Sequence, residues 1–246
     1  MAKDLGGPTG PSGHLPINGE ERDPEAVRDM FDRVAPRYDL INTVLSGGVD
    51  GAWRKRAARE THLRDGGSAI DVACGSGKLT AELGRLALPK GRVVGVDFSA
   101  QMLEVARKEY PMLEFIEGDA LNIPFDDGTF DASTIAFGLR NLSDPVRGLR
   151  EMLRVLKRGG RAVVLEFVHP PPGPIGMGYR LYLKTLLPAI GGAISGDAPA
   201  YRYLSDTIDS YRTPEELRDM AATAGWRDVR FHGLAFGTVG LLTGSR

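Results

Sequence analysis

The chain has 246 residues, of which 42% are hydrophobic and 26% are charged, enough to bury a full core as one domain. Its 31 Lys and Arg nearly balance its 32 Asp and Glu, so it carries no general excess of positive charge, and we expect no nucleic acid as a partner. A single cysteine, Cys74, excludes an internal disulfide framework and fits a reducing, cytoplasmic compartment.

The amino-terminal part predicts a tail followed by a helix. Residues 1–22 hold five glycines and three prolines with few large apolar residues, which is typical of a flexible tail. Asp23 can then cap a helix that has Pro24 at its first position, and we take residues 23–246 as a single domain. No apolar run reaches the roughly 18 residues of a membrane span, so we expect a soluble protein.

From Ala69 onward, short apolar runs alternate with helical patterns. This alternation predicts parallel strands joined by helical crossovers. The expected strands cover 69–73, 92–98, 113–118, 130–137 and 161–168, with helices from Ser99 and over 146–156. Near the end, Thr213 and Glu216 have capping-box spacing at the start of a further helix. Two last strands, over 226–234 and 235–242, are separated by little more than a turn and should pair antiparallel.

Residues 170–211 interrupt this alternation with the proline run "PPPGP" and an apolar, aromatic-rich helix candidate. We interpret the segment as a lid insertion that covers a pocket, lines a channel for an apolar tail and touches a bilayer surface. The alternative is a lid that only packs on the main core.

The stretch "AIDVACGSGKLTAEL" predicts a nucleoside site. A strand containing Asp71, then Gly75 and Gly77, then a helix, places bare backbone N–H groups at the carboxyl edge of a parallel sheet. Asp97 follows Gly77 by 20 residues at the end of the next strand, where a carboxylate can accept from both hydroxyls of a ribose. The alternative is a tight turn in which Asp97 only caps the helix from Ser99.

The kind of nucleoside is narrowed by what the loop lacks. Thr80 stands where a dinucleotide fingerprint has its third glycine, and the phosphate-loop spacing is absent as well. Asp119 ends the third expected strand, where it could accept from an adenine amine while Ala120 offers its backbone N–H. A surface acid before a loop is the alternative for Asp119.

Several blocks together resemble class I S-adenosylmethionine-dependent methyltransferases and, more narrowly, the demethylmenaquinone and ubiquinone C-methyltransferase family. The motif "DVACGSG" fits many methyltransferases, whereas "APRYDLIN", "FGLRN" and "YRYLSDTI" are much narrower. The resemblance runs from about Val27 to the last residue. It implies an α/β, Rossmann-like class I methyltransferase fold, with a seven-stranded mostly parallel sheet, an antiparallel last strand and helices on both faces.

The resemblance also implies S-adenosyl-L-methionine as cofactor, held by Gly75 and Gly77 and by positions that match the family's cofactor contacts: Thr80, Asp97, Asp119 and Ala120. Two departures stand out, Lys78 in place of an acid and Ala136 in place of a serine. A lysine would repel the amino group of the methionine moiety, so we expect Lys78→Asp to tighten cofactor binding. The alternative is a lysine that points to solvent.

The expected catalytic residues lie in "FGLRN" and in the first helix. Arg140 could stabilise a phenolate oxygen or orient a water that removes the proton, and Asn141 could hold the same oxygen network. Tyr38 and Asp39 could close over the pocket, and His169 is a further base candidate. The alternatives are a surface ion pair for Arg140, a packing and capping pair for Tyr38 and Asp39, and an ordinary loop histidine.

We therefore predict an enzyme that C-methylates a polyprenylated quinol, most simply demethylmenaquinol to menaquinol. A ubiquinone-pathway benzoquinol or another small-molecule acceptor is the alternative within the class. A nicotinamide-dependent oxidoreductase and a non-catalytic cofactor-binding subunit are the alternatives outside it. The histidines have no metal-ligand spacing with Cys74, so no metal is expected. We consider a homodimer and peripheral contact with the inner face of the membrane.

Overall fold

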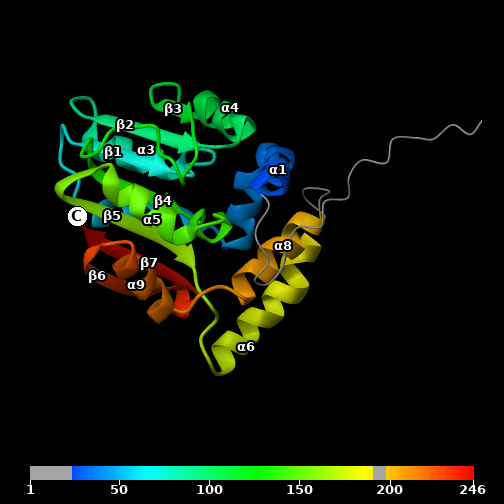
Figure 1. Ribbon diagram of the computed structural model, residues 1–246. Helices are drawn as coiled ribbons and strands as arrows, with labels where there is room; N and C mark the ends of the chain where they lie inside the picture. Colours follow the sequence, from blue (N-terminus) through cyan, green and yellow to red (C-terminus); the bar gives the residue numbers. More distant parts are fainter. Residues whose placement is uncertain (1–23, 191–197) are drawn as a thin grey trace, which may run out of the picture.

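The computed structural model describes residues 24–190 and 198–246 (Figure 1). The expected tail at 1–22 and the expected cap Asp23 lie outside these residues. Seven strands form one sheet in the order β3-β2-β1-β4-β5-β7-β6. Their bounds are β1 Ser68–Val72, β2 Arg92–Asp97, β3 Glu114–Glu117, β4 Phe130–Ala136, β5 Leu156–Phe167, β6 Arg227–Leu234 and β7 Val239–Ser245.

Strand pairing confirms the predicted fold class. Strands β1 to β5 pair in parallel with their neighbours, while β7 runs antiparallel between β5 and β6. The five central predictions are close to the observed strands, although β5 begins at Leu156, five residues before the expected start at 161. The prediction that the last strand begins at Ala235 is wrong. Ala235 and Phe236 have φ values of 46° and 57°, which extended backbone does not allow, so a short turn, η3 Ala235–Gly237, precedes β7.

Helices cover both faces of the sheet (Figure 1). Side chains alternate along each strand, so Ile70 and Val72 face a core with α5 and α9, whereas Ala69 faces a core with α2 and α3. The helices on these faces are α2 Asp50–Glu60, α3 Lys78–Ala87, α4 Ala100–Glu109, α5 Pro145–Arg154 and α9 Pro214–Thr223. The predicted caps are confirmed: Ser99 accepts from the Met102 N–H, and Thr213 and Glu216 form a capping box.

A separate group of helices lies beyond the carboxyl ends of the parallel strands (Figure 1). It comprises α1 Pro24–Leu45, α6 Pro174–Leu181, the π-helical segment η2 Tyr182–Leu186 and α8 Ala198–Asp209. Val27 and Met30 of α1 share a buried apolar cluster with Leu183 and Ile208 of the 170–211 segment. The first helix and the insertion therefore pack on each other over the sheet edge where the site was predicted.

Within the described residues, no helix is both long and apolar enough to cross a bilayer.

Candidate active site

The glycine turn after β1 has the geometry that the motif requires. Gly77 has φ 81° at the N-cap of α3, and a Cβ there would lie 2.7 Å from Cζ of Phe115, so both conformation and space demand glycine. Gly75 has φ 54°, and no atom lies within 4 Å of the position its Cβ would take. A ligand can therefore approach the backbone at Gly75, whereas Gly77 serves the turn itself.

Asp97 at the end of β2 is joined directly to this turn. Its two carboxylate oxygens accept the N–H of Gly75 at 2.8 Å and the N–H of Ser99 at 2.9 Å. The residue is 5% exposed, and burial raises its pKa from 3.8 to about 6 despite these hydrogen bonds. The sequence prediction that Gly75 and Asp97 belong to one sheet edge is confirmed, and the helix-end contact with Ser99 is present as well.

These residues line a cavity of about 490 Å³, the first cavity, at the carboxyl edge of the sheet. Its volume is in the range of small-molecule sites. Its walls include the predicted residues Gly75, Asp97, Asp119, Ala120 and Asn141, the departure Ala136, and the apolar side chains of Phe98, Met102, Phe137 and Leu142. Gly77 and Thr80 are outside this lining: Thr80 is fully buried, and its hydroxyl donates to Asp71 Oδ2 at 2.7 Å.

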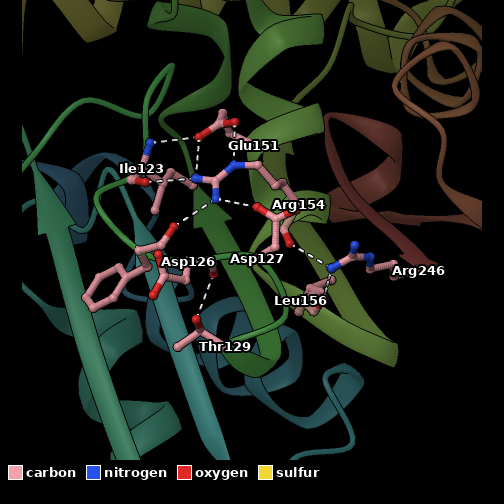
Figure 2. Close-up of polar contacts among 9 residues, drawn as sticks. Ile123, Asp126, Asp127, Thr129, Glu151, Arg154, Leu156 and Arg246 are labelled. Carbon is pink, nitrogen blue, oxygen red and sulfur yellow. Dashed lines mark hydrogen bonds and ion pairs between the residues drawn. The ribbon is translucent and has the colours of Figure 1, made fainter.

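Asp119 is an exposed residue of the cavity rim, and its Oδ1 accepts the N–H of Leu121 at 2.8 Å. The loop that follows it is held by Arg154 of α5 (Figure 2). The Arg154 guanidinium donates to the carbonyls of Ile123 and Phe125 and contacts Asp127, each at 2.8 to 2.9 Å, and is paired with Glu151. This arginine was missed from the sequence, where it reads as one more charge on an amphipathic helix.

Arg140 lies in the short turn η1 Leu139–Asn141 after β4 and is only 3% exposed. Its Nη1 contacts Glu166 Oε1 of β5 at 2.6 Å and donates to the Phe137 carbonyl at 2.6 Å. The ion pair anticipated as an alternative is present but buried, not at the surface. Glu166 also accepts the N–H of Arg140 and of Phe167, so three donors hold its carboxylate. Asn141 Nδ2 reaches the same Phe137 carbonyl at 3.4 Å.

Arg140 faces a second cavity of about 360 Å³. Its walls are largely aromatic: Trp53, Phe137, Phe167, Tyr179 and Tyr182. A second buried arginine, Arg54, pairs with Asp50 and lies 5.3 Å from the Phe137 ring centroid. Helix α2, which carries Trp53 and Arg54, was not predicted, because its apolar stripe consists mainly of alanines.

Asp39 of α1 contacts the glycine turn but lines neither cavity. It accepts from Ser76 Oγ at 2.7 Å and lies 3.3 Å from Lys78 Nζ, which also contacts Thr43 Oγ1 at 3.4 Å. Lys78 is therefore ion-paired with α1 instead of pointing freely to solvent. The side chain of Tyr38 lies outside the described part of the structure.

His169, the further base candidate, lies outside the linings of both cavities. It joins α6 to α8: its Nδ1 is 2.9 Å from the Asp209 carbonyl, and its Nε2 is 2.9 Å from Arg180.

The single cysteine, Cys74, also lies outside both linings. Burial raises the pKa of its thiol well above the usual value, which keeps the thiol neutral and fits the apolar cluster around it.

The strand order and the site at the carboxyl edge define the class I methyltransferase fold. A solved S-adenosylmethionine-dependent methyltransferase from Thermotoga maritima, described as a possible histamine N-methyltransferase, has a TM-score of 0.63. It is 22% identical, and the match covers 88% of this chain and 98% of that one, so it supports the fold alone. The model of the ubiE/COQ5 methyltransferase family matches residues 18–246. The chain belongs to this family, and its methyl donor is S-adenosylmethionine.

Relatives within the family are similar over nearly their whole length. The demethylmenaquinone methyltransferase of Deinococcus radiodurans is 43% identical, over 94% of this chain and 97% of that protein. The ubiquinone/menaquinone biosynthesis C-methyltransferase UbiE of Geobacter sulfurreducens is 41% identical, over 90% of this chain and 89% of that protein.

Proposed function

We propose that this protein transfers a methyl group from S-adenosylmethionine to a ring carbon of a polyprenylated demethylmenaquinol. The observation that carries the proposal is a pair of adjoining cavities. One has an acid at the end of β2 for a ribose, and the other is walled by aromatic rings and buried arginines. The choice of acceptor is supported by relatives that are named demethylmenaquinone methyltransferases, such as that of Deinococcus radiodurans.

In this proposal the first cavity holds the donor. Asp97 accepts from the ribose hydroxyls, and Asp119 with the Ala120 N–H receives the adenine, against the apolar wall of Phe98 and Met102. Gly75 leaves room for the ligand to touch the backbone. Thr80 does not line the cavity in this proposal, and its hydroxyl instead orients the buried carboxylate of Asp71. When bound, the donor supplies a methyl group activated by its sulfonium charge.

The second cavity is the proposed acceptor site. A quinol ring fits between the aromatic walls, and its carbon attacks readily when the neighbouring hydroxyl is ionised. Arg140, held by Glu166, presents fixed donors that stabilise the phenolate oxygen, while Asn141 lies on the donor side of the same turn. Asp39 of α1, which accepts from Ser76 in the glycine turn, closes the donor side of the site in this proposal, and the role expected of Tyr38 stays a prediction. His169 is set aside as a base, because it lines neither cavity.

The 170–211 segment is proposed as the lid over the acceptor site and the exit for its prenyl tail. Tyr179 and Tyr182 reach the cavity wall, and exposed apolar residues stand beside it: Ile175 at 55%, Met177 at 67%, Leu181 at 65% and Leu186 at 53% exposure. Arg180 and Lys184 lie among them and share Asp209 as ion-pair partner, at 3.2 and 3.1 Å, so a net positive charge remains to favour an anionic bilayer surface. The proposal includes peripheral contact with the inner face of the membrane and the homodimer considered from the sequence.

The proposal is tested with purified protein, labelled S-adenosylmethionine and chemically reduced demethylmenaquinone, with mass spectrometry of the lipid. We expect one added methyl on ring carbon with the quinol and none with the oxidised quinone. Asp97→Asn should weaken donor binding, whereas Asp65→Asn, an exposed acid at the opposite edge, should not. Failure of the wild type to methylate the quinol would contradict the proposal.

The name of the Geobacter relative, a ubiquinone/menaquinone biosynthesis C-methyltransferase, favours one second candidate, a benzoquinol of ubiquinone synthesis. The same assay with a reduced demethylated benzoquinone distinguishes the two acceptors by their kcat/KM.

A further inference from the structure

Among the described residues that line the two cavities, Phe137 alone belongs to both. It follows β4 directly and is 6% exposed. If donor and acceptor occupy the two cavities as proposed, the methyl group must pass beside this side chain.

The backbone of Phe137 is held in a conformation that bulky residues rarely adopt. Its φ is 58°, in the left-handed region, and such strain persists only where the surroundings enforce it. Its N–H donates to the Leu165 carbonyl at 2.8 Å, and its own carbonyl accepts from Arg140 Nη1 at 2.6 Å. The next residue, Gly138, is so crowded that a Cβ would lie 2.8 Å from the Cβ of Ala73. The turn is therefore clamped, which fixes the direction in which the Phe137 side chain leaves the backbone.

The ring of Phe137 also has a fixed set of neighbours. Its centroid lies 4.8 Å from that of Phe167 and 6.4 Å from that of Trp53. The Arg54 guanidinium lies 5.3 Å from the Phe137 ring, and that of Arg140 lies 5.5 Å from the Phe167 ring. These contacts make a rigid aromatic platform against which a flat ring can rest in one orientation.

Orientation matters because an ionised quinol has two nucleophilic positions. Attack by carbon forms a carbon–carbon bond, breaks the sulfur–methyl bond and releases a proton from that carbon. Attack by the phenolate oxygen breaks the same sulfur–methyl bond and gives a methyl ether, after loss of the hydroxyl proton. The oxygen is bonded to the ring carbon next to the nucleophilic carbon, so a small displacement of the acceptor exchanges one for the other.

We propose that Phe137 is a positioning residue that makes carbon, and not the adjacent oxygen, the atom that meets the methyl group. The inference rests on the proposed function and deepens it. The ring supplies the wall that fixes the acceptor, and the Arg140–Glu166 pair keeps that wall in place through the Phe137 carbonyl.

The test uses Phe137→Leu and Phe137→Met, two apolar side chains without a flat ring, with Phe231→Leu on the remote strand β6 as matched control. Donor affinity is measured by calorimetry, and acceptor affinity by the quenching of tryptophan fluorescence with menadione, since Trp53 lines the second cavity. Products from demethylmenaquinol are separated into C-methyl and O-methyl forms by mass spectrometry. We expect both affinities to stay within about threefold, kcat to fall on the order of 100-fold, and O-methyl product to appear.

Unchanged kcat and unchanged product ratio in both Phe137 variants, with an active wild type, would overturn this inference and leave the proposed function standing. Loss of menadione quenching in both variants would overturn it too, because Phe137 would then be needed for the cavity itself. Absence of turnover by the wild type would overturn the proposed function and this inference together. Phe231→Leu should match the wild type in kcat and product.

Discussion

Acidification should weaken donor binding through Asp97. Burial raises the pKa of Asp97 to about 6, so in the free protein about nine-tenths of this carboxyl is protonated at about pH 5. Hydrogen bonds from ribose hydroxyls favour the ionised form and lower the pKa in the complex. We therefore expect the Kd for S-adenosylmethionine to be about tenfold higher at about pH 5 than at about pH 7.

The same carboxyl should have the opposite effect on folding. Because its folded pKa is above its unfolded value of 3.8, the folded free protein binds the proton more tightly than the unfolded chain does. The unfolding free energy therefore falls as pH rises from about 4 to about 6, and the pKa difference corresponds to about 3 kcal/mol. Protonation of Asp97 therefore stabilises the fold of the free protein while it weakens donor binding.

Calorimetric titration with the donor across this pH range checks the expected change in Kd. Urea unfolding of the free protein at the same pH values checks the expected change in unfolding free energy. Asp97→Asn should bind the donor weakly at every pH. In urea unfolding it should lose about half of the pH slope that the two buried carboxyls supply, because burial raises the pKa of Asp71 to about 6 as well. Asp32→Asn should move the midpoint to lower pH, because the Asp32 charge helps to raise the Asp97 pKa. A wild-type Kd that is flat between about pH 5 and pH 7 would refute the reasoning.

Three further substitutions test other contacts. Lys78→Asp should tighten donor binding in calorimetry, and weaker binding would count against this expectation. The same substitution should lower the Tm, because it replaces the ion pair between Lys78 and Asp39 by two neighbouring carboxylates. Arg154→Gln should lower the unfolding free energy in urea by about 2 kcal/mol and raise the donor Kd, because the loop after Asp119 loses charge-assisted hydrogen bonds. An unchanged unfolding free energy would contradict this. Thr213→Ala removes the capping box of α9 and should cost about 1 kcal/mol in the same unfolding assay, with a change near zero arguing against it.

The sheet and one side of the site could be predicted because their signals are local. Apolar runs mark β1 to β5, and the carboxyl ends of adjacent parallel strands meet at one edge, which brings Gly75 to Asp97. Asp119 follows from the same rule, because β3 lies next to β2.

The acceptor side could not be predicted in the same way, because its contacts join distant residues. Glu166 lies in the apolar run "VVLEF" with no local sign that Arg140, 26 positions earlier, is its partner. Trp53 and Arg54 lie on a helix whose buried residues are two alanines and two charged residues, so no strong apolar periodicity marks it. The left-handed backbone of Phe137 is enforced by Leu165 and Arg140, and a phenylalanine gives no hint of it.

The buried arginines of the second cavity have a consequence for when this enzyme acts. Arg54 and Arg140 are each neutralised by a carboxylate of the protein itself, Asp50 and Glu166. An aromatic carboxylate would enter fully charged, give up its hydration and meet cations whose charge is already balanced, a cost of several kcal/mol. A quinol enters neutral, and its phenolate charge develops only beside the fixed donors of Arg140. Methylation is therefore expected after any ring carboxyl has been removed, on a precursor that is uncharged.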